Sequence, residues 1–166
     1  NHTIKDGLFQ EWHDNGCLET IGMIENNQEQ GEWKRWHDNG QLAATGSMKN
    51  GHKDGEWKWY HPNGKLSVLS NWIEGEEIGL HKEWTDDGFL NTIEFRGYGP
   101  YKKIDYLEDK HTIIFFSHAP VGPDFGIQKF WHKKEVTLED QMEHEKSVLN
   151  HENIVLSSDD YMPLPL

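Results

Sequence analysis

Eleven histidines are the first residues of this 166-residue chain to suggest chemistry. His13, His37 and His61 recur at a constant interval, as the ligands of a repeated metal site would. Equivalent positions in successive hairpins of a sheet lie two strands apart, roughly 10 Å. Zinc binds nitrogen ligands at about 2 Å, so these imidazoles cannot share one ion. We therefore predict no metal site and interpret the periodic histidines as surface or half-buried packing groups.

The other reactive side chains give no catalytic pattern. Cys17 is the single cysteine, so it excludes an internal disulfide and says little about the cellular compartment. Carboxylate pairs such as Glu76-Glu77 and Asp86-Asp87 stand in polar, turn-like segments, where solvated charge is the ordinary explanation. The chain has no GxSxG, P-loop or GxGxxG motif. The sequence predicts a protein that is not an enzyme, with no catalytic residues and no cofactor.

Aromatic side chains remain as candidates for binding. The chain is only 34% hydrophobic yet has 8 tryptophans, and its aromatics recur with the same period as the histidines. One row consists of the aromatics that occupy the position of Trp12 in successive repeats, and a second row starts at Phe9. Strand alternation places the two rows on opposite faces of the sheet. Both rows could be core, or at least one could stay partly open as an interaction stripe. The candidate partner-binding residues are Trp12, Trp36, Tyr60 and Trp84 in the first row, and Trp33 and Trp57 in the second, with Trp59 beside it.

The formal net charge of −13 narrows the classes of partner. Such a surface repels phosphate backbones and anionic lipid, so we expect no nucleic-acid and no membrane partner. No stretch approaches the roughly 18 apolar residues that a membrane-spanning helix needs. We expect a basic protein partner; the alternative is that the charge only keeps a flat sheet soluble and its edges unpaired.

A glycine-initiated block recurs four times with the same spacing between copies and without slippage. The copies run from Gly7 to Gly16, Gly31 to Gly40, Gly55 to Gly64 and Gly79 to Gly88, and a leucine follows each copy two residues later. A fixed period of this length is typical of repeat proteins whose units stack on their neighbours.

Each repeat is predicted to be one β-hairpin. A first strand, such as 31–37, leads into an Asn-Gly or Asp-Gly pair, for which we predict a type I′ turn with positive φ at both central residues. A second strand with alternating apolar residues follows, and a polar connector leads to the next repeat. The predicted fold is all-β: an elongated antiparallel meander of tandem 24-residue hairpins.

The strict period ends after Arg96, which gives three predicted regions. Residues 1–96 form the four hairpin repeats, and residues 97–136 form degenerate repeats that continue the sheet. Within them, Thr112–Ser117 reads as a buried strand, and the segment from Gly126 resembles the start of a further repeat. Residues 137–166 form a short C-terminal capping helix and an extended tail; Thr137 and Asp140 make a capping box, and an apolar stripe faces the last sheet edge.

The pattern G-x-W-x-x-[WY]-H-x-N-G-x-L over residues 7–96 resembles the variant MORN repeat, found in the YwqK family of bacterial antitoxins. The resemblance implies a single layer of hairpins that contacts proteins and has no catalytic residues. Phe9 and His81 depart from the first tryptophan of the pattern, and Thr85 departs from the histidine. Variation in terminal copies is expected of capping repeats.

These observations favour a non-enzymatic protein-binding module that clasps its partner with an acidic, aromatic-lined sheet. The resemblance implies that this module is antitoxin-like. One alternative is a structural subunit of a larger assembly, such as a viral particle or filament, which self-associates through its sheet edge or C-terminal tail. Another is a carbohydrate-binding surface on the tryptophans, because aromatic faces also suit sugar rings.

Overall fold

The computed structural model describes residues 6–97, 102–106, 112–117, 127–132, 137–149 and 162–163. In them the chain is all-β, built of consecutive antiparallel hairpins with one short C-terminal helix, as predicted. Contacts group the chain into two compact units. Unit 1 comprises the described residues up to Ile78 together with Trp84–Phe89, and unit 2 comprises Gly79–Glu83 and the described residues from Leu90 onward. The division falls inside the fourth repeat.

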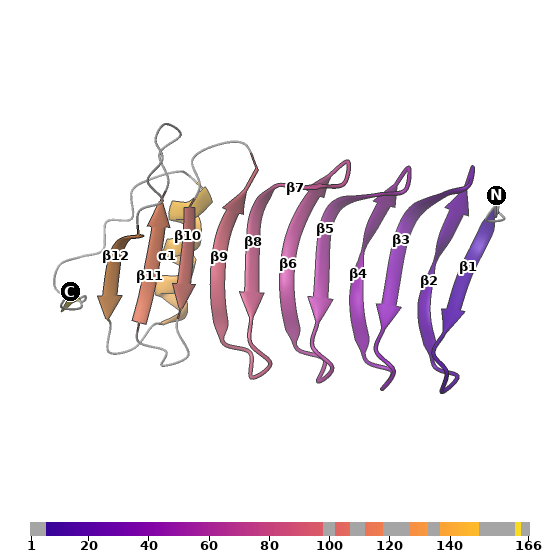
Figure 1. The fold of residues 1–166 in the computed structure, drawn as a ribbon, viewed down its shortest axis with the longest axis horizontal. Helices are drawn as coiled ribbons and strands as arrows, with labels where there is room; N and C mark the ends of the chain where they lie inside the picture. Colours follow the sequence, from indigo (N-terminus) through magenta and orange to yellow (C-terminus); the bar gives the residue numbers. More distant parts are fainter. Residues whose placement is uncertain are drawn as a thin grey trace. The chain divides into compact units, whose positions relative to one another are not determined.

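Unit 1 is one layer of strands in which each strand pairs with the next (Figure 1). The register places Phe9 opposite Gly22, Trp33 opposite Gly46, and Trp57 opposite Ser70. Bulges interrupt the register in every hairpin, so the strands twist. The strands are β1 (Gly7–Trp12), β2 (Leu18–Glu25), β3 (Gln28–Trp36), β4 (Leu42–Lys49), β5 (His52–Tyr60), β6 (Leu66–Ile73) and the two-residue β7 (Glu76–Glu77).

The turns inside the repeats differ from the prediction. At the first Asn-Gly pair, only Gly16 has a positive φ, and its N–H donates to the carbonyl of His13 at 2.8 Å. The N–H of His13 donates to the carbonyl of Cys17 at 2.9 Å, so three residues lie in the loop, and only the last is left-handed. That is the geometry of a three-residue hairpin loop. The predicted type I′ turns at the Asn-Gly pairs are therefore wrong.

Type I′ turns instead form the polar connectors between repeats. Both residues of Asn26-Asn27, Asn50-Gly51 and Glu74-Gly75 have positive φ, and each pair is a complete two-residue loop between two strands. The connectors are thus as tight as any turn in the repeat, and strands of neighbouring repeats pair as closely as strands within one.

The periodic histidines and asparagines hydrogen-bond each repeat to the next. The ring nitrogen Nε2 of His37 donates to the carbonyl of Tyr60 at 2.8 Å. Nδ2 of Asn39 donates to the carbonyl of Pro62 at 2.7 Å, while its Oδ1 accepts from the N–H of Gln41 at 3.0 Å. The same bonds, displaced by one repeat, are made by His13, Asn15, His61 and Asn63. The His-x-Asn-Gly motif therefore fixes the stacking of the turns.

We expect Asn39→Ala to lower the free energy of unfolding by about 1–2 kcal/mol, because it removes one bond within its turn and one to the next repeat. Urea unfolding followed by circular dichroism measures the change. Asp38→Ala is the matched control, because Asp38 is an exposed side chain in the same turn. Equal effects of the two substitutions would contradict the stacking role of the asparagine.

Asp6 ends the ladder of connectors at the N-terminal side of unit 1. In later connectors, the N–H of Gly51 donates to the carbonyl of Glu29, and the N–H of Gly75 to that of Lys53, each at 3.0 Å. At the first connector, the N–H groups of Asn26 and Asn27 donate instead to the Asp6 carboxylate, at 3.0 and 2.9 Å. These two bonds hold the pKa of Asp6 below its ordinary value of 3.8.

Asp6 is expected to make the stability of unit 1 depend on pH in acid. Because its pKa is lowered in the folded state, its contribution is present above the ordinary value of 3.8 and is lost as the pH falls through the lowered value. Asp6→Asn should therefore destabilise the protein at neutral pH, and the difference from the unaltered protein should vanish below that window. Urea midpoints measured for both proteins across the acid range test this; a difference that grows on acidification would contradict it.

Unit 2 has its own core, between paired strands and the helix. Ile93 and Ile104, which face each other in the register, are fully buried, and the buried Tyr106 hydroxyl lies 2.8 Å from Nδ1 of His144. Unit 2 includes most of β8 (Gly79–Trp84), and β9 (Leu90–Arg96), β10 (Lys102–Tyr106), β11 (Thr112–Ser117), β12 (Ile127–His132), α1 (Leu138–Leu149) and β13 (Met162–Pro163). The strand predicted at Thr112–Ser117 is confirmed, while its side chains lie outside the described residues.

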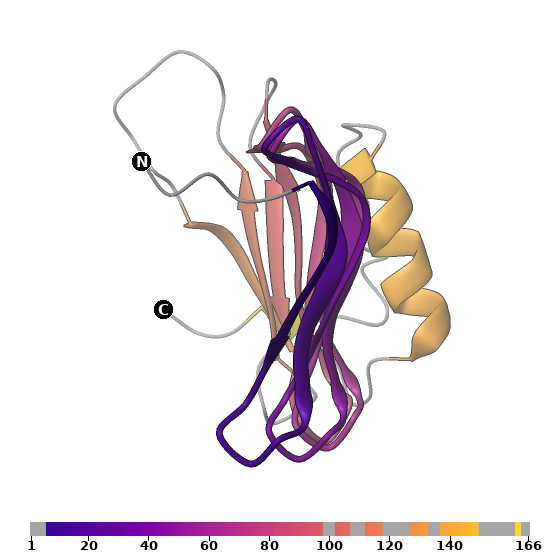
Figure 2. The ribbon, with the colours of Figure 1, turned by 90° about the vertical axis from the view of Figure 1, so that its right-hand side faces the viewer.

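The helix begins with the predicted capping box but packs differently from the prediction. Thr137 and Asp140 exchange hydrogen bonds of 2.7 and 3.2 Å. Leu138 and Met142, expected to be buried, are 73% and 53% exposed. Of the predicted apolar stripe, Val148 is buried, together with His144, against β9 and β10, on a face of the sheet in unit 2 rather than at its last edge (Figure 2). The buried face of the helix is therefore mixed, with the apolar Val148 beside the polar Tyr106–His144 pair.

Candidate functional site

Trp33 and Trp57 are the core of unit 1. They are 3% and 4% exposed, although the unit has a single layer, because each indole lies flat on the sheet. Trp33 covers Gly22, where an added Cβ would lie 2.2 Å from the ring, and Trp57 covers Gly46, where it would lie 2.3 Å away. The ring N–H groups are satisfied by the carbonyls of Gln30 and Ser47, at 3.2 and 2.9 Å. These two predicted site residues are therefore buried and form part of the floor of the site.

The remaining predicted residues are more accessible. Trp59 is half-buried and packs against Trp57, with ring centroids 5.7 Å apart. Trp12 is 56% exposed. Trp36, Tyr60 and Trp84 are half-buried, and their backbone carbonyls accept the histidine bonds of the stacked turns. The structure thus brings Trp33, Trp57 and Trp59 together and leaves the row of Trp12 in a structural role at the turns.

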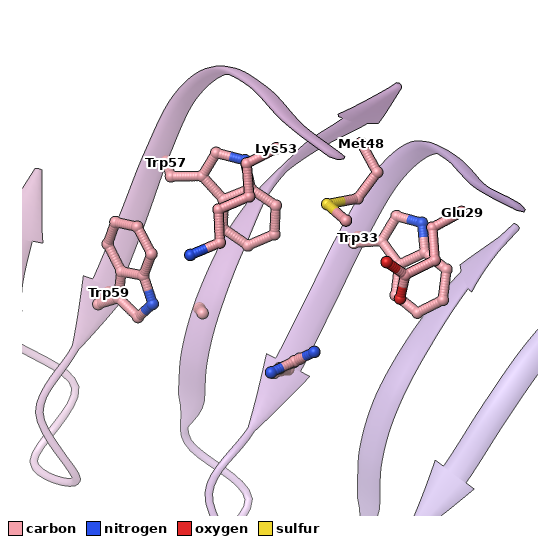
Figure 3. Close-up of a pocket in the computed structure, with 8 residues that line it drawn as sticks. Glu29, Trp33, Met48, Lys53, Trp57 and Trp59 are labelled. Carbon is pink, nitrogen blue, oxygen red and sulfur yellow. The ribbon is translucent and has the colours of Figure 1, made fainter. Parts of the chain in front are cut away.

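A small cavity of about 70 Å³ lies between the second and third repeats (Figure 3). Its walls are indole rings, and Met48 stands between Trp33 and Trp57. Three charged side chains also reach it, two of them cations. We call it the aromatic pocket, and its lining residues are Glu29, Trp33, Arg35, Ala44, Met48, Lys53, Trp57 and Trp59.

Lys53 is held over three tryptophan rings. Its ammonium lies 5.1 Å from the Trp57 centroid, 4.6 Å from Trp59 and 4.3 Å from Trp72. Contacts of this kind contribute about 0.5–2 kcal/mol each, most where the cation is desolvated. Burial lowers the pKa of Lys53, the Arg35 guanidinium lowers it further, and Glu77 opposes the shift.

Sequence reasoning missed Lys53, Arg35 and Trp72 as parts of the site. Lys53 lies at the start of β5 and Trp72 near the end of β6, and only the register Gly55 opposite Trp72 brings them over the same rings. A signal was present, because Glu29, Lys53 and Glu77 follow one another at the repeat interval and the middle one reverses the charge. A basic residue at a repeat position that is otherwise acidic is a sequence signal for a functional site.

The periodic histidines are hydrogen-bonded to the backbone of the stacked turns. The Nε2 atom of each periodic histidine must be the hydrogen-bond donor, because its partner is a backbone carbonyl and a carbonyl oxygen can only accept. Over the ranges that the structure describes, no three His, Cys, Asp or Glu side chains are grouped to hold a metal ion. Among these same residues, no helix is long and apolar enough to cross a membrane.

Comparison with known families places the pocket between two recognised repeats. Residues 29–50 and 53–74 match the family model of the MORN repeat variant. No curated protein matches the chain. The first matched segment supplies Glu29, Trp33 and Arg35, and the second supplies Lys53 and Trp57. Two consecutive segments of the chain are therefore similar to the MORN repeat variant, and the aromatic pocket is formed where these two segments stack.

Proposed function

We propose that the chain is a non-enzymatic protein-binding repeat module that holds a partner protein on the aromatic face of unit 1. The observation that carries this proposal is the aromatic pocket, a cavity with indole walls on a one-layer sheet. Tryptophan and arginine in a recess are the side chains that most often dominate the energy of protein interfaces. Here Trp59 and Arg35 supply both, on a rigid scaffold of paired strands.

The partner we propose is a basic protein, in the manner of a toxin held by an antitoxin-like protein. Exposed acidic side chains lie on the strands and turns of unit 1, and the whole chain carries −13. Such a field speeds the approach of a basic partner and weakens with salt. The exposed acidic residues include Glu11, Glu25, Glu32, Asp38, Glu56 and Glu74.

The intact chain used as bait in the lysate of its source tests the proposal. We expect one stoichiometric basic protein, released by raised salt, and we expect Trp59→Ala to abolish its retention. Trp12→Ala is the matched control, because it removes the same side chain from a 56% exposed position away from the pocket. Urea unfolding of each variant verifies folding. Recovery of the chain alone, or of a partner retained equally by both variants, would contradict the proposal.

A further inference from the structure

Arg35 and Lys53 bring two cations to the aromatic pocket. In the part of the chain that the structure describes, neither cation forms an ion pair with a carboxylate. Glu29 also lines the pocket, but its carboxylate lies beside the Trp33 ring (Figure 3) and does not contribute to the pKa shift of Lys53. The lining has two cations and one carboxylate, while the Glu77 carboxylate, outside the lining, partly offsets the charge of Lys53.

The two cations repel each other at a partly dehydrated place. Burial and the Arg35 charge lower the pKa of Lys53, and Glu77 opposes them only in part. An anion beside Lys53 would reduce that penalty. Binding of a further cation is disfavoured, because Lys53 already lies over the three tryptophan rings and Arg35 would repel a second positive charge.

The size and walls of the pocket restrict the anion. A cavity of about 70 Å³ holds the volume of two or three waters, at about 30 Å³ each. A carboxylate with a short apolar stem fits these walls, because the stem can lie against Met48 and the indole of Trp57 while the oxygens meet the cations. Arg35 is an exposed residue of β3, so its guanidinium is accessible to the incoming group.

We propose that the aromatic pocket binds a carboxylate, and that this carboxylate is an aspartate or glutamate side chain of the partner protein. This inference rests on the proposed function and makes it more specific: a basic partner is attracted by the acidic surface and is fixed by one acidic residue placed in the cationic pocket. Charge pairs formed in a partly dehydrated recess of this kind give an interface its register.

Blocked amino acids test the pocket without the partner. N-acetyl-glutamate amide carries only a side-chain carboxylate, N-acetyl-glutamine amide is its neutral match, and N-acetyl-alanine carries only a terminal carboxylate. Each is titrated into the full-length protein at constant ionic strength, and the indole N–H resonances of Trp57 and Trp59 are followed by NMR. We expect saturable shifts with the glutamate probe, a dissociation constant on the order of millimolar, and no saturation with the glutamine probe.

Arg35→Gln should weaken binding of the glutamate probe at least about tenfold, because it removes a charge-assisted contact. Lys34→Gln is its matched control: it has the same change of charge, one residue away on β3, and Lys34 is already paired with Glu32 at 3.2 Å. Unchanged indole and amide spectra of the unliganded variants verify the fold. Equal binding of both neutral and charged probes, or equal effects of the two substitutions, would overturn the carboxylate site. Tighter binding of N-acetyl-alanine would overturn the side-chain assignment.

The outcomes separate this inference from the proposed function. If the probes do not bind while the bait still retains a partner through Trp59, the carboxylate inference is wrong and the binding module stands. If the glutamate probe binds as expected while no protein is captured, the pocket is an anion site and the protein-binding function is wrong.

Discussion

Trp57→Ala is expected to lower the free energy of unfolding of unit 1 by about 3–5 kcal/mol. The indole is 4% exposed, packs against Trp59 and covers Gly46, so its removal opens a gap in a one-layer core that has no second sheet to close it. Domains are stable by only about 5–15 kcal/mol, so this single change removes a large part of the stability.

Amide hydrogen exchange is the suitable measurement, because the chain has two compact units and need not unfold in one step. Exchange should accelerate in β3 to β6 and change little in β9 and β10. Trp12→Ala is the control, because a 56% exposed ring contributes little burial. Comparable acceleration by both substitutions would contradict a core formed by tryptophans lying on glycines.

Gly46→Ala is expected to destabilise unit 1 by about 1–3 kcal/mol or more, as overpacking does. The new Cβ would lie 2.3 Å from the Trp57 ring, so either the ring or the strand would have to shift. Gly46 does not have a positive φ, so backbone strain does not explain the effect.

A double-mutant cycle with Trp57→Ala isolates the contact. Without the indole, Gly46→Ala should become neutral or stabilising by about 0.5–1 kcal/mol, because alanine is the better strand residue. The reversal of sign is the expected result, read from urea unfolding of the four proteins. If Gly46→Ala costs the same free energy of unfolding with and without the indole, the Trp57 ring is not the reason that position 46 requires glycine.

The repeat period predicts the strands of unit 1, because a block that recurs at a constant interval without slippage fixes which segments pair. The repeat also shows in sequence the contact that forms the core, the tryptophan ring on a glycine, since Gly22 precedes Trp33 and Gly46 precedes Trp57 by the same distance along the chain. Turn type was not predictable in the same way. Asn-Gly suits both a two-residue and a three-residue loop, and the long-range bonds of Asn39 to the next repeat favour the second.

The pocket was only partly predictable. The sequence singles out Trp33, Trp57 and Trp59 by type and period, but which of them are buried depends on how the rings lie on the strands. Lys53 and Trp72 come together only through the register of β5 and β6 and the bulges that shift it. In unit 2, the apolar stripe of the helix was only a partial guide, because Val148 is buried while Leu138 and Met142 are exposed and the polar His144 is buried with Tyr106.

Indole N–H chemical shifts of the full-length protein, recorded as the captured partner is added, test the central claim most directly. The chain has 8 tryptophans, so each face of unit 1 carries its own reporters. Binding at the aromatic pocket predicts that Trp57, Trp59 and Trp72 shift together and saturate at one partner per chain. Shifts confined to Trp12, or a saturating complex that leaves those three resonances unmoved, would contradict it.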